Sequence, residues 1–287
     1  MKTDRLLFIW IIGLFACGIL GVPLWGMLLG SLGYGIFLLL LRPYSSLFWI
    51  GYLLHGVLKR PVPAFYLYDL AYRHGAKAAA APMIAFATLL MQKSQYAQAL
   101  SVLLDVRKQK NLKPQLERLS LQHLALAYDK SGDVRKAIET MEQIRKERKD
   151  GTYLDCDFYA TLAYYYIQTG EYARADELNS LALAENENCT AVYDNMGLIA
   201  YQNGELDQAQ AMFLKALALD STMVSPKYYL GCIAQARENL VAAASYFRAA
   251  HKAEIDGLSI ISKAQIDEKY AQCAGSQKAP YEERQRR

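Results

Sequence analysis

The sequence lacks most of the residue patterns that carry enzymatic chemistry. Its four histidines stand far apart, at no spacing typical of a metal site. It has no Gly-rich phosphate loop followed by Lys and Ser or Thr, no H-E-x-x-H segment and no G-x-S-x-G turn. We therefore expect no catalytic residue, no metal ligand and no cofactor, and we expect that the protein is not an enzyme.

Cysteine is also scarce, and its five copies are scattered along the chain: Cys17, Cys156, Cys189, Cys232 and Cys273. No two of them form a C-x-x-C pair. This excludes a disulfide framework and the common spacings of zinc sites. Scattered free thiols are typical of a reducing compartment.

Most of the chain has no excess of positive or negative charge. The formal net charge is +4, but five of the 32 Lys and Arg and one of the 28 Asp and Glu lie within residues 1–60. The remaining residues carry 27 of each sign, so they offer no basic face of the kind that nucleic acids require. We expect no nucleic-acid partner, and we place the positive excess beside lipid headgroups.

Charged residues are absent altogether from Leu6 to Leu41. This run of 36 residues exceeds the roughly 20 residues that one membrane span needs. The segment GVPLWG (21–26) interrupts it with Gly and Pro, which break helices. The pattern predicts a transmembrane hairpin of two short helices, about 6–20 and 24–41. One long, tilted or kinked span is the alternative.

The flanks of the uncharged run indicate its orientation. Lys2 and Arg5 precede it and Arg42 follows it, so both ends are expected on the cytoplasmic side. The aromatic-rich stretch at about 45–58 ends in Lys59–Arg60 and is short for a span, which predicts an interfacial helix. If that stretch did span the bilayer, the rest of the chain would lie on the opposite face.

Residues 1–60 are therefore interpreted as a membrane anchor in contact with the lipid bilayer. Within it, Gly26 and Gly30 form a small-xxx-small pattern that lets membrane helices approach closely. This pattern predicts either packing within the hairpin or homo-oligomerisation through Gly26 and Gly30.

The rest of the chain repeats itself. GEYARADELNSLALAEN (170–186) and GELDQAQAMFLKALALD (204–220) match at a spacing of 34 residues, and the match extends to five units. The units start at Ala80, Arg118, Cys156, Thr190 and Val224. Ala occupies the twentieth place of every unit: Ala99, Ala137, Ala175, Ala209 and Ala243.

The repeated places have a physical meaning. Small residues at the eighth and twentieth places let two antiparallel helices cross closely, and large residues at the seventh and twenty-fourth places fill the space around the crossing. Gly132, Gly170 and Gly204 stand at the fifteenth place, where the first helix ends and the chain turns. One such pair cannot bury its apolar face alone, so stacked pairs share a core.

This pattern resembles the tetratricopeptide repeat (TPR), a helix–turn–helix unit of 34 residues. The resemblance covers residues 80–257 and implies an all-α fold, a right-handed α-solenoid of five TPR units. The usual fourth-place aromatic is present as Tyr159 and Tyr193 but is missing elsewhere, and Asn179 stands where a large apolar residue belongs. The first two unit spacings are 38 residues, which predicts longer helices or loops there.

Helices are predicted on both sides of the repeats. Residues 61–79 form a linker helix. Within it, three residues fit the second helix of a degenerate sixth unit: Ala64, Tyr68 and Ala71. Residues 258–273 have apolar side chains at helical spacing, which predicts a helix that caps the solenoid. The polar tail, 274–287, is expected to be disordered.

The resemblance also implies where a partner binds. In TPR proteins the first helices line a concave groove, which the second, fifth, ninth, twelfth and thirteenth places face and the sixth place adjoins. These places predict a peptide-binding site of Asp157, Tyr164, Gln168, Asp194, Asn195, Tyr201, Gln202, Ser225 and Tyr228. Tyr and amide side chains suit contacts with an extended backbone. The alternative is that the tyrosines pack on one another.

One specialisation of the family is not expected here. TPR domains that bind chaperone C-termini hold the carboxylate with Lys, Asn and Arg, and of these only Asn195 matches. Ala160 and Tyr164 replace one Lys and Asn, while Ser225 and Tyr229 replace the other Lys and the Arg. Without cations the face cannot favour a terminal carboxylate, so we predict no such binding.

The sequence favours a membrane-anchored TPR scaffold or adaptor that recruits a protein or peptide partner, with the solenoid in the cytoplasm. The first alternative is a structural or assembly subunit of an integral membrane complex, in which the repeats serve packing. A lesser alternative is a membrane enzyme with a site near residues 45–60, supported only by His55 and the cations Lys59 and Arg60.

Overall fold

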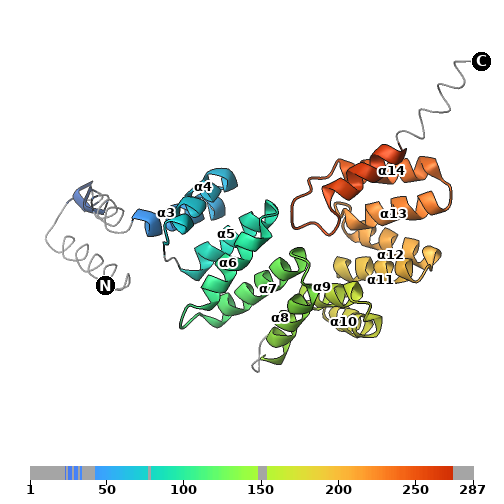
Figure 1. Ribbon diagram of the computed structural model, residues 1–287, viewed down its shortest axis with the longest axis horizontal. Helices are drawn as coiled ribbons and strands as arrows, with labels where there is room; N and C mark the ends of the chain where they lie inside the picture. Colours follow the sequence, from blue (N-terminus) through green and yellow to red (C-terminus); the bar gives the residue numbers. More distant parts are fainter. Residues whose placement is uncertain are drawn as a thin grey trace, which may run out of the picture. The chain divides into compact units, whose positions relative to one another are not determined.

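The computed structural model describes residues 43–76, 79–147 and 154–273, together with 23, 25–27, 29–31 and 33 (Figure 1). In these residues all regular secondary structure is helical, and there is no strand. The two predicted hairpin helices lie mostly outside the described residues, and the predicted disordered tail lies outside them entirely. Among the described residues, none of the helices combines the length and the apolar character that crossing a bilayer requires.

The chain forms two compact units, Met1–Phe86 and Ala87–Arg287. The boundary between them falls inside α5 (Ala80–Gln92), whereas the sequence predicts changes of domain at residues 60 and 79.

The first unit is built around a pair of helices, α3 (Pro43–Gly56) and α4 (Pro61–Arg73), which contact each other. A Cβ atom on Gly51 of α3 would lie 2.9 Å from the Tyr68 ring of α4, so glycine lets the helices approach. The residues predicted to form the second helix of a degenerate sixth unit are fully buried here: Ala64, Tyr68 and Ala71. The rings of Phe48, Tyr68 and Phe86 meet at centroid distances of 5.6–6.3 Å.

The second unit continues with helix pairs in chain order. The first helices of the five predicted units are α5, α7 (Pro114–Lys130), α9 (Cys156–Gln168), α11 (Thr190–Gln202) and α13 (Ser225–Ala236). The second helices are α6 (Tyr96–Arg107), α8 (Val134–Lys146), α10 (Tyr172–Glu185), α12 (Leu206–Leu219) and α14 (Leu240–His251). In the last three units the first helices contact one another in succession, α9 with α11 and α11 with α13. The prediction of an all-α helical repeat is confirmed.

The turn between the two helices of each pair has a left-handed residue at the fifteenth place. Gly132, Gly170 and Gly204 have φ angles of 87°, 78° and 79°, as predicted from their position. Ser94 and Glu238 occupy the same place in the first and last units with φ of 59° and 60°. The repeat therefore imposes a left-handed turn even where no glycine supports it.

The predicted crossing of the helices is confirmed in detail. A Cβ atom on Gly197, at the eighth place, would lie 2.5 Å from Phe213 at the twenty-fourth. The same holds for Gly231 and Phe247, at 2.6 Å. The three units with Ala at the eighth place carry Leu, Met or Asn at the twenty-fourth. Each crossing therefore pairs its smallest residue with a partner of matching size.

The wider spacing of the early units is partly taken up by α7. This helix begins at Pro114, four residues before the unit start at Arg118, and is 17 residues long. Proline at its first turn suits a helix start, because the missing N–H has no intrahelical partner there. The second extra stretch falls largely on residues 148–153, which lie outside the described residues.

The C-terminal helix spans residues 263–273, not 258–273 as predicted. The helix starts later because Ser262 and Gln265 form a reciprocal cap. The Ser262 N–H donates to the Gln265 side-chain oxygen at 2.9 Å, and the Gln265 N–H donates to Ser262 Oγ at 3.3 Å. The apolar residues before this cap, including Leu258, belong to a non-helical segment over residues 252–262.

Candidate protein-interaction face

We use the term first-helix face for the side chains at the second, fifth, sixth, ninth, twelfth and thirteenth places of α7, α9, α11 and α13. Three of the nine predicted site residues on this face are buried: Asp194, Asn195 and Ser225 are 2%, 3% and 5% exposed. Ser225 Oγ donates to Asp194 Oδ1 at 3.0 Å, which joins α13 to α11. Burial raises the pKa of Asp194 to about 7. These side chains are committed to contacts between repeats.

Asn195 makes the same kind of contact and explains an anomaly of the sequence. Its Nδ2 donates to the Ala160 carbonyl oxygen at 2.8 Å and to Asn179 Oδ1 at 3.1 Å. Asn179, placed where the family has a large apolar residue, is thus a buried acceptor for the next repeat. A buried amide needs such partners, so the two Asn residues suit each other.

The predicted tyrosines lie partly exposed on the face and form an aromatic cluster. The rings of Tyr201 and Tyr229 meet edge to face at a centroid distance of 5.1 Å, and Tyr228 contacts Tyr229 in the same way at 5.3 Å. Tyr164, on α9, interacts electrostatically with Tyr229, and its pKa is raised by burial. The hydroxyls stay protonated at physiological pH and can donate to a carbonyl group.

The remaining predicted residues are exposed and polar. Gln168 Nε2 donates to Asp129 Oδ1 at 2.7 Å, and Gln202 Oε1 accepts from the Tyr172 hydroxyl at 2.7 Å. Asp157 is exposed at the start of α9 beside Cys156. Tyr164 and Gln168 therefore lie in the C-terminal half of α9, and Tyr201 and Gln202 lie at the C-terminal end of α11. Asp157 lies at the opposite, N-terminal end of α9.

The face contains residues that the sequence-based prediction missed. Asp129 and Lys130 occupy the twelfth and thirteenth places of α7, so the same rule applied to that unit would have found them. Their charged groups lie 3.7 Å apart, and both side chains are largely buried. Cys232, at the ninth place of α13, lies beside the hydroxyls of Tyr201 and Tyr228.

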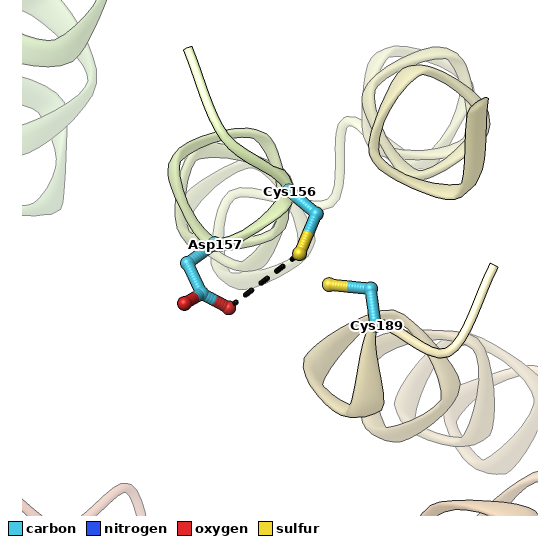
Figure 2. Close-up of side chains that lie close together, drawn as sticks. All are labelled: Cys156, Asp157 and Cys189. Atoms are coloured by element: carbon cyan, nitrogen blue, oxygen red, sulfur yellow. Dashed lines mark hydrogen bonds between the residues drawn. The ribbon is translucent and has the colours of Figure 1, made fainter. Parts of the chain in front are cut away.

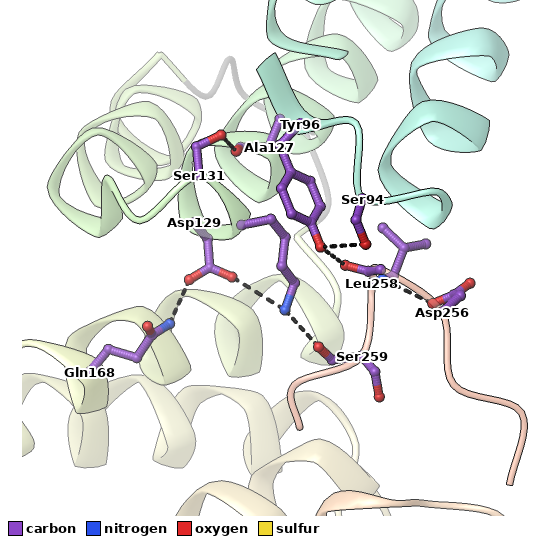
Figure 3. Close-up of polar contacts among 11 residues, drawn as sticks. Ser94, Tyr96, Ala127, Asp129, Ser131, Gln168, Asp256, Leu258 and Ser259 are labelled. Carbon is purple, nitrogen blue, oxygen red and sulfur yellow. Dashed lines mark hydrogen bonds and ion pairs between the residues drawn. The ribbon is translucent and has the colours of Figure 1, made fainter. Parts of the chain in front are cut away.

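Lys130 binds the main chain of the segment over residues 252–262. Its Nζ donates to the Ser259 carbonyl oxygen at 3.0 Å, as Figure 3 shows. Two residues earlier in the segment, the Gly257 carbonyl oxygen accepts from the Tyr96 hydroxyl at 2.9 Å. The Gly257 N–H donates to the Gln92 carbonyl oxygen, also at 2.9 Å. This stretch of the chain is thus held by its backbone against the α5–α6 turn and α7.

Glycine at position 257 is required for this contact. A Cβ atom there would overlap the Met91 carbonyl oxygen and crowd the Ser94 backbone nitrogen at 2.9 Å. Farther along, the helix over residues 263–273 packs beside part of the face, because Tyr228 lies against the same buried clusters as Ile266 and Tyr270. Tyr228 stays partly exposed there, as Tyr164 and Tyr201 do on α9 and α11.

The comparisons with known proteins agree with this arrangement. A family model described as tetratricopeptide repeat matches residues 120–144 and 190–223. The second interval coincides with the unit that begins at Thr190. These two intervals of the chain are similar to the tetratricopeptide repeat. No curated protein matches the chain.

Solved TPR proteins have the same fold. TTC0263, a thermophilic TPR protein of Thermus thermophilus, is 19% identical with a TM-score of 0.54, covering 68% of this chain and 99% of its own. A TPR protein from Parabacteroides merdae ATCC 43184 is 16% identical with a TM-score of 0.52, covering 80% and 98%. At these identities the similarity concerns the fold alone.

Proposed function

We propose that this TPR protein is a non-catalytic scaffold that recruits a partner protein by holding an extended segment of it on the first-helix face. The observation that carries the proposal is the way in which the chain holds its own residues 257–259. The Tyr96 hydroxyl and the Lys130 ammonium group donate to two main-chain carbonyl oxygens, and the main-chain carbonyl of Gln92 accepts from the Gly257 N–H. Side chains of the repeats thus bind the main chain of another segment, which forms a turn at residues 256–259.

The part of the face left for a partner lies on α9 and α11. Tyr164 and Tyr201 offer hydroxyl donors on apolar rings, and Gln168 and Gln202 offer amides that both donate and accept. The set carries no cation. Asn195, the one residue that matches the chaperone-binding clamp, is buried against Ala160. Both facts support the prediction that acidic chaperone C-termini are not the ligands.

Selection from a random peptide library with the full chain tests this proposal. We expect bound peptides to lose about tenfold in affinity with Tyr201→Ala, which removes a central ring of the face. The matched control is Leu214→Ala on α12, an exposed residue of a second helix, which should leave the affinity unchanged. The absence of any selected peptide, or equal losses with both variants, would contradict the proposal.

We also propose that residues 1–60 anchor the protein to a membrane, with the repeats on the cytoplasmic side. The support is the uncharged run of 36 residues and its basic flanks. Further support comes from α3 and the turn that follows it, where Trp49 and Leu53 of the helix and Val57 of the turn are 53%, 52% and 69% exposed. Exposed apolar side chains on a helix followed by Lys59–Arg60 suit a position among headgroups. Protease treatment of sealed, right-side-out cells tests the topology, since digestion of the repeats from outside would refute it.

A second candidate is an assembly subunit whose repeats mainly serve internal packing. Its support is the self-contact of the chain, in which Ser259 already accepts from Lys130 and the C-terminal helix packs beside Tyr228. Deletion of residues 1–60 separates the two candidates. An adaptor keeps its partner after the deletion, whereas an assembly subunit loses it together with the membrane segment. Homo-oligomerisation through Gly26 and Gly30 belongs to the second candidate.

A further inference from the structure

Two thiols and a carboxylate meet at one end of the α9–α11 layer. Cys156 is the first residue of α9, Asp157 follows it, and Cys189 directly precedes Thr190, the first residue of α11. Figure 2 shows the two sulfur atoms directed toward each other, with the Asp157 carboxylate beside Cys156. Their ligand atoms all lie within 4.8 Å of one another, and the distance from Cys156 Sγ to Asp157 Oδ1 is 3.8 Å.

The repeat explains why residues so far apart in sequence meet. Cys156 and Cys189 are separated by 33 residues, one less than the repeat length of 34. Equivalent ends of successive first helices lie side by side, so a separation close to one repeat places two side chains together. Spacing rules for zinc sites look for ligands two to five residues apart and do not detect this arrangement.

The distances suit a tetrahedral ion. With Zn–S bonds of about 2.3 Å and Zn–O bonds of about 2.0 Å, the edges of the tetrahedron are roughly 3.5–3.8 Å. The edge between sulfur and oxygen is the shorter one, about 3.5 Å, and Cys156 Sγ lies 3.8 Å from Asp157 Oδ1, so a movement of a few tenths of an ångström would close it around the ion. A disulfide would instead require the sulfur atoms to come within about 2.05 Å and would leave the carboxylate without a role.

The Cys156 sulfur has a polar neighbour besides Asp157. The Asn186 side-chain nitrogen lies 3.8 Å from Cys156 Sγ, while Asn186 Oδ1 accepts from the Asn188 N–H at 3.0 Å. This second bond orients the amide so that its NH₂ group faces the sulfur. Cys156 also lies at the N-terminus of α9, where the helix dipole stabilises negative charge. Cys189 is 2% exposed, and burial raises its pKa to about 12, so ion binding must displace its proton.

We propose that Cys156, Asp157 and Cys189 bind one Zn²⁺ ion, with water at the fourth position. Both thiols release a proton to solvent, the carboxylate is already ionised, and no electron is transferred. Among the described residues this is the one grouping of His, Cys, Asp and Glu side chains close enough to share an ion. The bound ion would fasten the start of α9 to the start of α11. The proposal does not depend on peptide binding.

Titration of the reduced, full chain with Co²⁺ and then Zn²⁺ tests the site. We expect one equivalent of Co²⁺ to produce a thiolate-to-cobalt charge-transfer band, which Zn²⁺ abolishes, with about two protons released per ion. Cys156→Ser or Cys189→Ser should weaken binding about 100-fold, and Asp157→Asn about tenfold. Cys232→Ser, which removes another partly buried thiol, is the matched control and should leave the affinity for Co²⁺ and Zn²⁺ unchanged.

Several outcomes would overturn the proposal. The first is the absence of a charge-transfer band at one equivalent of Co²⁺. The second is an unchanged affinity for Co²⁺ in Asp157→Asn, at an exposed position, and in Cys156→Ser, with folding of both variants confirmed by circular dichroism. The third is formation of a Cys156–Cys189 disulfide in air that Zn²⁺ does not prevent, which would make the pair a redox couple.

Discussion

At the crossing of α11 and α12, one substitution should destabilise the original chain but stabilise a variant with a smaller side chain on the partner helix. In Gly197→Ala the new methyl group would lie 2.5 Å from Phe213 Cε1, more than 1 Å inside ordinary van der Waals contact. Overpacking of this kind costs about 1–3 kcal/mol, while Ala gains about 1 kcal/mol over Gly in a helix interior. We expect the substitution to lower the free energy of unfolding by up to about 2 kcal/mol.

The same substitution should stabilise a variant in which the ring is gone. In Phe213→Leu the smaller side chain opens the space, as in the first unit, where Ala87 is paired with Leu103. Gly197→Ala then keeps its helix-propensity gain of up to about 1 kcal/mol and loses the clash. The coupling between the two positions should be about 2 kcal/mol.

Urea unfolding of the full chain, followed by circular dichroism, measures this cycle. The control combines Gly197→Ala with Phe247→Leu, the equivalent ring of the next unit, and should show additive effects because the two residues belong to different crossings. Additive effects in the matched pair, or equal coupling in the control, would refute the size complementarity argued for each crossing.

Three further predictions concern single positions. Gly257→Ala places a methyl group on the Met91 carbonyl oxygen, so residues 252–262 should detach from the repeats. They should then become sensitive to limited proteolysis while the total helix content stays unchanged. Continued protection from the protease would count against the contact. Glu238→Gly should raise the free energy of unfolding by about 1 kcal/mol, because Glu238 holds φ of 60° without the freedom of glycine; a decrease in a urea titration would contradict this. Burial raises the pKa of Asp194 to about 7 in the folded state, against about 3.9 in the unfolded state. The contribution of Asp194 to the free energy of unfolding is therefore fully present below pH 4 and is lost as the pH rises through 7. Asp194→Asn should therefore be more stable than the original chain by about 2–4 kcal/mol at pH 8 and close to it at pH 4, and a difference independent of pH would disprove the assignment.

The repeat frame could be predicted from the sequence because it depends on local sterics. In each unit, Ala at the twentieth place indicates a close helix crossing. Gly at the fifteenth place indicates the turn after the first helix. The left-handed turns at Ser94 and Glu238 could be predicted only from the register, since neither residue signals such a turn.

The candidate site was less predictable. The repeat positions indicate which side chains lie on the first-helix face, but not which of them are buried in contacts with the next repeat. Asn195 faces Asn179 and Ala160 instead of a partner, which only the combined geometry of two repeats determines. The contact at Gly257 joins it to Tyr96, a residue 161 positions earlier in the sequence, and no local sequence pattern indicates such a contact. The thiol pair was missed because its spacing follows the repeat rather than a short motif.

The central claim, that the first-helix face recruits a partner, is tested most directly by photo-crosslinking in cells. A photoreactive residue at Tyr201 lies on the part of the face left for a partner, and one at Leu214, exposed on α12, serves as the control. The claim predicts that Tyr201 gives a discrete crosslinked partner, that Leu214 does not, and that Gln168→Ala reduces the yield. Crosslinks from Tyr201 only to residues of this chain would contradict it.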